Sequence, residues 1–179
     1  MKISELKIPG CFLITPNIIE DERGSFVKTF HINEFERSDI FFQPKEEFFS
    51  FSKKNVIRGL HFQVPPYQHN KLVYCPKGKV IDFFCDLRKS SPSYGKSLKV
   101  ELSADTSNVL YLPSGIAHGF LSLTNNSLMV YKTDCVYNPE SDKGLLWSSI
   151  NLNLDVSTPL LSDRDLSFPS FLDFESPFK

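Results

Sequence analysis

The sequence predicts an all-β fold, a sandwich or barrel of short strands, and three observations support this. Seventeen phenylalanines, twelve prolines and recurrent glycine, asparagine and serine breaks divide the chain into short apolar segments of about five to eight residues. Pro76-Lys77-Gly78 is typical of a tight turn between two such segments. The polar run from Asp86 to Pro92 is typical of a loop that follows a strand. Helical periodicity is weak throughout the chain. Many short strands with frequent turn signals are typical of sandwiches and barrels.

Strands are expected, in chain order, where apolar or alternating segments lie between turn residues. They cover Cys11–Thr15, Ser25–His31, Glu47–Phe51, Val56–Phe62, Lys71–Cys75, Lys79–Asp86, Ser97–Leu102, Asn108–Leu112, His118–Leu123 and Leu128–Val136. The best helical candidates are Asn33–Arg37 and a turn near Ser162–Asp165. From about residue 157 the chain is rich in proline, serine and phenylalanine, and we expect an irregular segment that packs over the body, because its aromatic content does not suit a free tail.

Size and composition predict one domain and exclude several classes of partner. A chain of 179 residues fits one core, so residues 1–179 are expected to form a single domain. A formal charge of -1 gives no electrostatic basis for binding nucleic acid or an anionic membrane. No apolar run approaches the ~18 residues of a membrane span. The scattered cysteines and the absence of a signal peptide predict reduced thiols and a cytoplasmic location.

Two histidine motifs carry the chemistry. His61-x-Gln63 is followed by Lys71 and, after six residues, by Gly78. This has the outline of the first motif of the cupin superfamily, which is His-x-His, then Glu, then six residues and Gly. The run from Pro113 to His118 matches the second motif, Pro-x-Gly-x-x-His. The chain therefore resembles a cupin, a double-stranded β-helix (jelly roll), in which a glutamine and a lysine replace two metal ligands. Because an ammonium cannot bind a metal ion, we expect neither a metal nor another cofactor.

A wider set of motifs resembles the dTDP-4-dehydrorhamnose 3,5-epimerase family. The matches extend over nearly the whole chain and comprise Asp21–Gly24, Arg58–Gln63, Lys71–Val73, Asp86–Arg88, Ser91–Gly95, Ala117–Phe120, Val130–Lys132 and Leu161–Asp165. The resemblance implies an epimerase that inverts C3, C5 or both in a nucleotide-activated 4-keto-6-deoxy sugar, for deoxysugar and surface polysaccharide biosynthesis. It also implies a homodimer that exchanges N-terminal strands, with residues from about 20 to 50 reaching the partner's site.

The resemblance assigns four catalytic roles. His61 matches the general base, Asp165 the carboxylate paired with it, Lys71 the cation beside the ketone, and Tyr131 the acid on the opposite face. Removing a proton next to a ketone requires a base, a positive charge or donor at the carbonyl oxygen, and an acid that returns a proton. Taken alone, Tyr131 could be an edge-strand aromatic, and Asp165 could be a turn or cap residue that is easily confused with Asp163.

Further residues are expected around the nucleotide sugar, and some depart from the family pattern. By resemblance, Arg58 lies near the sugar and Arg23 near the diphosphate, and the remaining substrate-binding candidates are Phe26, Lys28, Glu46, Phe48, Gln63, His118 and Tyr137. Lys28 stands where relatives commonly carry a glutamate, and Glu46-Glu47-Phe48 replaces a Gln-Asp-Asn run. Because lysine only donates hydrogen bonds and a carboxylate only accepts them, we hypothesise a carrier other than dTDP, with CDP or GDP as the options, although the sequence leaves all three open.

Three other functions stay open on the sequence. The first is a metal-dependent cupin enzyme that uses His61, His69 and His118. The second is a 3,4-ketoisomerase, which would keep the base but shift the ketone. The third is a non-catalytic cupin that only binds a sugar.

Overall fold

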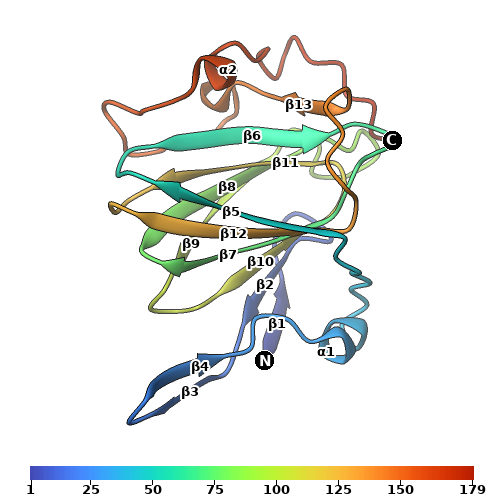
Figure 1. The fold of residues 1–179 in the computed structure, drawn as a ribbon. Helices are drawn as coiled ribbons and strands as arrows, with labels where there is room; N and C mark the ends of the chain where they lie inside the picture. Colours follow the sequence, from blue (N-terminus) through green and yellow to red (C-terminus); the bar gives the residue numbers. More distant parts are fainter.

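The computed structural model describes residues 1–179 and contains two antiparallel sheets that face each other (Figure 1). The six-stranded sheet has the order β1 (Lys2–Glu5), β2 (Phe12–Thr15), β10 (Val109–Leu112), β7 (Lys71–Lys77), β12 (Ser127–Thr133) and β5 (Glu46–Ser52). The five-stranded sheet has the order β13 (Asp142–Gly144), β6 (Ile57–Gln63), β11 (Ile116–Ser122), β8 (Lys79–Asp86) and β9 (Ser97–Ser103). Chain neighbours such as β6 and β7 lie in different sheets, and the prediction of an all-β jelly roll is confirmed.

The main core fills the space between the two sheets. Val73, Leu110 and Met129 project into it from the six-stranded sheet, and Val80 and Phe84 from the five-stranded sheet. Each strand alternates its side chains between its two faces, so Phe83 and Cys85 of β8 belong to a second cluster on the outer face. Apolar residues are therefore needed on both faces of β8, and its sequence Val-Ile-Asp-Phe-Phe-Cys is nearly continuously apolar.

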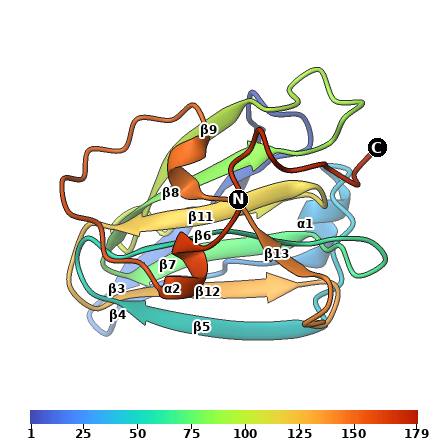
Figure 2. The same cartoon turned by 90° about the horizontal axis from the view of Figure 1, so that it is seen from above.

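The chain after β13 covers the outer face of the five-stranded sheet, as Figures 1 and 2 show. This segment contains the short helix η1 (Trp147–Ser149) and α2 (Asp163–Leu166) and is otherwise irregular. Leu145, Ile150 and Phe178 are buried against the sheet, and Phe62 of β6 packs edge-on against Phe178 with ring centroids 6.0 Å apart. On the other side of the molecule, α1 (Ile32–Glu36) and the chain after it cover part of the six-stranded sheet.

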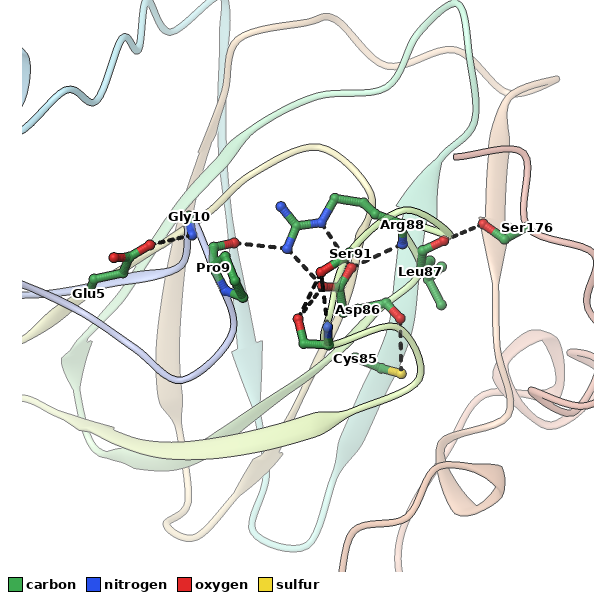
Figure 3. Close-up of polar contacts among 10 residues, drawn as sticks. Glu5, Pro9, Gly10, Cys85, Asp86, Leu87, Arg88, Ser91 and Ser176 are labelled. Carbon is green, nitrogen blue, oxygen red and sulfur yellow. Dashed lines mark hydrogen bonds and ion pairs between the residues drawn. The ribbon is translucent and has the colours of Figure 1, made fainter. Parts of the chain in front are cut away.

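The turn after β8 holds both ends of the chain to the sandwich (Figure 3). Asp86, at the end of β8, is fully buried and accepts two hydrogen bonds from the Arg88 side chain, at 2.9 and 2.8 Å. The same guanidinium donates to the carbonyl of Pro9 at 2.8 Å, which holds the loop between β1 and β2. Ser176 donates to the carbonyl of Leu87, so the C-terminal tail is attached one residue further along. Burial works to raise the pKa of Asp86, but the hydrogen bonds from Arg88 and nearby serines outweigh it and lower the pKa.

A two-stranded hairpin projects from the N-terminal side of the sandwich (Figure 1). It consists of β3 (Ile18–Asp21) and β4 (Gly24–Val27), which pair only with each other. Nearly all of its residues are exposed, including Ile19 and Phe26, each 61% exposed. We call this hairpin the arm. It buries little apolar surface within its own chain.

Every predicted strand overlaps an observed one, but some boundaries differ. The expected strand Ser25–His31 ends early, because β4 stops at Val27 and His31 is the N-cap position of α1, although its side chain makes no capping hydrogen bond. Phe30 packs against Phe35 of α1 instead, with ring centroids 4.9 Å apart. Strands β1, β3 and β13 were not predicted. No helix is long and apolar enough to span a membrane.

Candidate active site

A cavity of about 360 Å³ lies at the end of the sandwich where β6 and β11 of one sheet meet β5, β7 and β12 of the other. It is lined by Glu46, Phe48, Ser50, Arg58, His61, Phe62, Gln63, His69, Lys71, His118, Phe120, Tyr131, Thr133, Cys135, Tyr137, Asp142 and Arg164. Nine of the predicted site residues are in this set: Glu46, Phe48, Arg58, His61, Gln63, Lys71, His118, Tyr131 and Tyr137.

His61 and Asp165 form a directly hydrogen-bonded pair. Asp165 Oδ1 lies 2.8 Å from His61 Nε2, and Asp165 Oδ2 accepts the backbone N–H of Gly59 at 3.1 Å. The carboxyl group is buried and Ser162 caps its helix, whereas Asp163 is exposed. Burial acts to raise the pKa of Asp165, but the hydrogen bonds from His61 and Gly59 prevail and lower it. Asp165 is therefore held as a carboxylate that orients the imidazole.

Gly59, which donates its N–H to Asp165, lies where β6 and β11 approach each other closely. Its φ is +114°, in a region that side chains disfavour. A Cβ at this position would lie 2.6 Å from the Cα of Gly119 on the neighbouring strand β11. The close approach of β6 and β11 therefore requires a glycine here.

Lys71 places a buried ammonium in the cavity. It is the first residue of β7, only 8% exposed, and its Nζ donates to the carbonyl of His61 at 2.9 Å. Burial lowers the pKa of Lys71 to about 8, opposed by the negative charges of Asp142 and Asp82. The ammonium is thus still mostly protonated at pH 7.

Tyr131 lies on β12, in the sheet opposite His61. Its hydroxyl is 3.3 Å from Ser50 Oγ, and its ring stacks on Phe48 with centroids 4.8 Å apart and planes inclined by 13°. Burial raises the pKa of Tyr131, so the phenol keeps its proton. This is the state required of an acid.

His118 and Arg58 complete the wall formed by the five-stranded sheet. His118 lies directly opposite His61 in the register of β11 and β6. Its Nε2 is 2.7 Å from Oδ2 of Asp82, and both residues are buried. Arg58 is held by Ser52 Oγ and the carbonyl of Phe51, both at 3.1 Å, which directs its guanidinium along the β5 side of the site.

Gln63 occupies the position of the second histidine in the cupin motif. Its side-chain amide forms hydrogen bonds with backbone groups of the protein. Its Oε1 accepts the N–H of Asn138 at 2.6 Å, and its Nε2 donates to the carbonyls of Tyr67 and Val136. No group of three or more His, Cys, Asp or Glu side chains is placed to hold a metal ion, so His61, His69 and His118 do not form such a cluster.

Three predicted residues lie away from the cavity of their own chain. Arg23, Phe26 and Lys28 are on the arm or just after it, where Arg23 pairs with Asp21 at 2.5 Å. Phe26 and Lys28 line a separate surface hollow together with His31 and Glu34. Within one chain, then, the structure does not bring the predicted diphosphate and base contacts to the predicted catalytic residues.

Several residues that line the cavity were not predicted as site residues from the sequence. Arg164 and Asp142 pair with each other at 2.6 Å, and Ser50, Thr133 and Cys135 also line the site. His69 was named only as a ligand of the metal-dependent alternative, and it lines the cavity too. Arg164 is next to Asp165, and its guanidinium lies over the ring of Phe168 at 5.1 Å. Only its position within the Leu161–Asp165 motif could have drawn attention to it.

The fold and the site define a jelly-roll protein with an acid–base site between its two sheets. The family model of dTDP-4-dehydrorhamnose 3,5-epimerase matches residues 5–173, and the chain belongs to this family. The enzyme of that name from Shigella flexneri is 41% identical, over 97% of each chain, and that from Escherichia coli K12 is 39% identical over 92% of this chain and 91% of its own.

Solved structures agree with this assignment. An epimerase from Legionella pneumophila in complex with dTDP-4-keto-L-rhamnose is 31% identical, with a TM-score of 0.91 over 97% of this chain and 94% of its own. A 3'-monoepimerase from Streptomyces bikiniensis, bound to dTDP-quinovose, is 29% identical, with a TM-score of 0.86 over 92% of this chain and 85% of its own.

Proposed function

We propose that this protein epimerises a nucleotide-activated 4-keto-6-deoxy sugar at C3, C5 or both, by proton removal and return next to the ketone. One observation carries the proposal. His61 on β6 and Tyr131 on β12 belong to facing sheets and line one cavity, and the buried ammonium of Lys71 lies in the same cavity. A base and an acid on opposite walls can act on opposite faces of one sugar ring, which is what inversion of a carbon requires.

The proton path follows from the hydrogen bonds. Because Asp165 accepts at His61 Nε2, that nitrogen carries the ring proton in the neutral state, and Nδ1 holds the free lone pair. Nδ1 removes the proton next to the ketone, and the imidazolium that forms is stabilised by Asp165. The ketone oxygen gains negative charge as the enolate forms, and Lys71 stabilises it. Tyr131 then gives its proton to the other face of the carbon. Before the next turnover, the His61 imidazolium releases its proton to solvent and the Tyr131 phenolate takes one up, so that both groups return to their starting states.

The arm supports a homodimer that exchanges N-terminal strands. Its apolar residues Ile19 and Phe26 are exposed, and Arg23 and Lys28 are far along the chain from the catalytic residues. Placed in the site of a second copy, the arm would add cationic groups for a diphosphate and an aromatic ring for a base. Sedimentation of the full chain should give twice the monomer mass, and a monomer that retains full activity would refute the exchange.

For the carrier we propose dTDP, because the relatives' names specify it. The competing expectation, CDP or GDP, rests on Lys28, which lies beside Phe26 in the surface hollow. Calorimetric titration with dTDP, CDP and GDP separates the two. Tighter binding of CDP or GDP than of dTDP would refute our choice. From the composition of the chain and the family match over residues 5–173, we also propose a cytoplasmic single-domain enzyme, residues 1–179, of deoxysugar biosynthesis for a surface polysaccharide.

Incubation with a dTDP-linked 4-keto-6-deoxy sugar in D2O tests the activity. We expect deuterium at C3, C5 or both, detected by NMR, together with the inverted product. Tyr131→Phe should still exchange protons at the carbon facing His61 but form little inverted product. Binding without any exchange would indicate a sugar-binding protein, and a ketone moved to C3 would indicate a ketoisomerase, so either result refutes the proposal.

A further inference from the structure

His69 is a cavity residue for which neither the motifs nor the proposed proton path has a role. It lies in the loop between β6 and β7, two residues before Lys71, and lines the same cavity as His61 and Tyr131. Its Nδ1 is 3.1 Å from Gln63 Nε2. Its Nε2 is buried and has no hydrogen-bond partner within the protein. A buried polar group without a partner costs about 1–3 kcal/mol, which calls for an explanation.

The contacts of Gln63 determine which nitrogen of His69 carries the proton. Asn138 donates its N–H to Gln63 Oε1, and the carbonyls of Tyr67 and Val136 lie 2.8 and 3.2 Å from Gln63 Nε2. The amide orientation is thereby fixed, with its NH2 group toward His69. A protonated Nδ1 would set donor against donor, so Nδ1 must be the acceptor. The neutral ring then has its proton on Nε2, the nitrogen without a partner.

The surroundings of His69 keep the ring neutral. Burial lowers the pKa of His69 to about 3, and the positive charge of Lys71 acts in the same direction. The ring is therefore a fixed N–H donor at working pH. It is neither a base nor a cation, so it can act on an anionic oxygen without adding a second charge beside Lys71.

We propose that His69 Nε2–H donates a hydrogen bond to the C4 oxygen of the bound sugar, beside the Lys71 ammonium. This hydrogen bond becomes stronger as the oxygen gains the negative charge of the enolate. The inference rests on the proposed function, since Lys71 marks where the ketone oxygen lies. Lys71 provides the charge and His69 a directed donor, and such donors, fixed in place before the reaction, stabilise the transition state more than the ground state. His69 is then a catalytic residue, and it is identified by the hydrogen bonds around Gln63 and not by a sequence motif.

Two variants test this donor. His69→Leu removes the N–H, while Gln63 keeps one carbonyl for each of its two amide hydrogens, so the wall should stay intact. His69→Gln restores a donor on a side chain of similar length. We expect kcat to fall about 100-fold in His69→Leu with little change in KM, because a bond that strengthens in the transition state affects kcat. His69→Gln should recover at least about tenfold of that loss.

A direct measurement uses 15N-labelled histidine. The NMR spectrum of the free protein should show His69 protonated at Nε2 and not titrating between pH 5 and 8, within the range where histidines ordinarily titrate. The Nε2–H signal should move downfield on adding the dTDP-linked 4-keto sugar but not on adding dTDP alone.

The outcomes separate this inference from the proposed function. If the wild type exchanges deuterium and His69→Leu stays within about threefold of it in kcat, the donor role is wrong and the epimerase assignment stands. A signal from His69 that shows Nδ1 protonated would also overturn it. If the wild type shows no exchange at all, the proposed function itself fails.

Discussion

Replacing Lys71 with methionine should make the protein more stable and inactive. The side chain keeps its length and apolar stem but loses the buried charge. In the folded state the pKa of Lys71 is about 8, against an ordinary value of 10.5. Each pKa unit corresponds to about 1.4 kcal/mol, so the charged lysine costs the fold about 3 kcal/mol at pH 7. The variant also loses the hydrogen bond from Nζ to the carbonyl of His61, which reduces its gain in stability by about 1 kcal/mol. A net gain of about 2 kcal/mol is expected.

The sign of the pH dependence follows from the lowered pKa. Between pH 8 and 10.5 the unfolded chain binds more protons at Lys71 than the folded chain does, so wild-type stability gains from this group as pH rises through that window. Lys71→Met lacks this gain. Its advantage over the wild type should be largest below pH 8 and should vanish above pH 10.5.

Urea denaturation at pH 7 and pH 10, with deuterium exchange into the sugar at pH 7, provides the assay. Lys132→Met is the matched control, because Lys132 follows Tyr131 on β12 but projects from the opposite face of the strand, does not line the cavity, and pairs with Glu47 at 2.6 Å. It should change the free energy of unfolding by at most about 1 kcal/mol and leave exchange intact. A Lys71→Met variant that is less stable than the wild type at pH 7, or that retains exchange, would refute the reasoning.

Three further substitutions test the supports of the site. Asp165→Asn should lower kcat at least about 100-fold, measured by deuterium incorporation, because His61 loses the carboxylate that stabilises its protonated form. Gly59→Ala should destabilise by about 3 kcal/mol in urea, because its Cβ would meet the backbone of β11, and unchanged stability would contradict the close approach. Arg88→Met should cost about 3 kcal/mol in thermal or urea unfolding, because the buried Asp86 carboxylate loses its charged partner. Asp86 has a lowered pKa, so its stabilisation is present above about pH 4 and lost on acidification, and this acid dependence should weaken in the variant.

The strands of the sandwich could be predicted because they bury apolar side chains between clear turns. Strands β1, β3 and β13 were missed because their sequences, KISE, IIED and DKG, are largely polar or carry no distinct alternation. The end of β4 was misplaced for a tertiary reason. Phe30 belongs to the cluster around α1, so the chain leaves the extended conformation before His31 although its composition favours a strand.

Some residues of the site could be predicted from short-range spacing in the sequence, and others depend on contacts between distant parts of the chain. His61 and Lys71 are ten residues apart, and their spacing with Gly78 was enough to single them out. Asp165 is 104 residues from His61 and emerged only from the resemblance. No sequence spacing pointed to His69. Which of its ring nitrogens carries the proton depends on the orientation of the Gln63 amide, and contacts with Tyr67, Val136 and Asn138 fix that orientation.

The two positions that depart from the cupin metal motif have taken up different tasks. Gln63 uses its amide oxygen and nitrogen to join the chain after β12 to the loop after β6, and it fixes the tautomer of His69. Lys71 keeps a positive charge in the cavity where a metal would supply one. A lysine buried to this degree opposes folding, and a methionine there would stabilise the protein. A charge kept against that cost fits the proposed role of Lys71, which is to stabilise the negative oxygen that forms in the reaction.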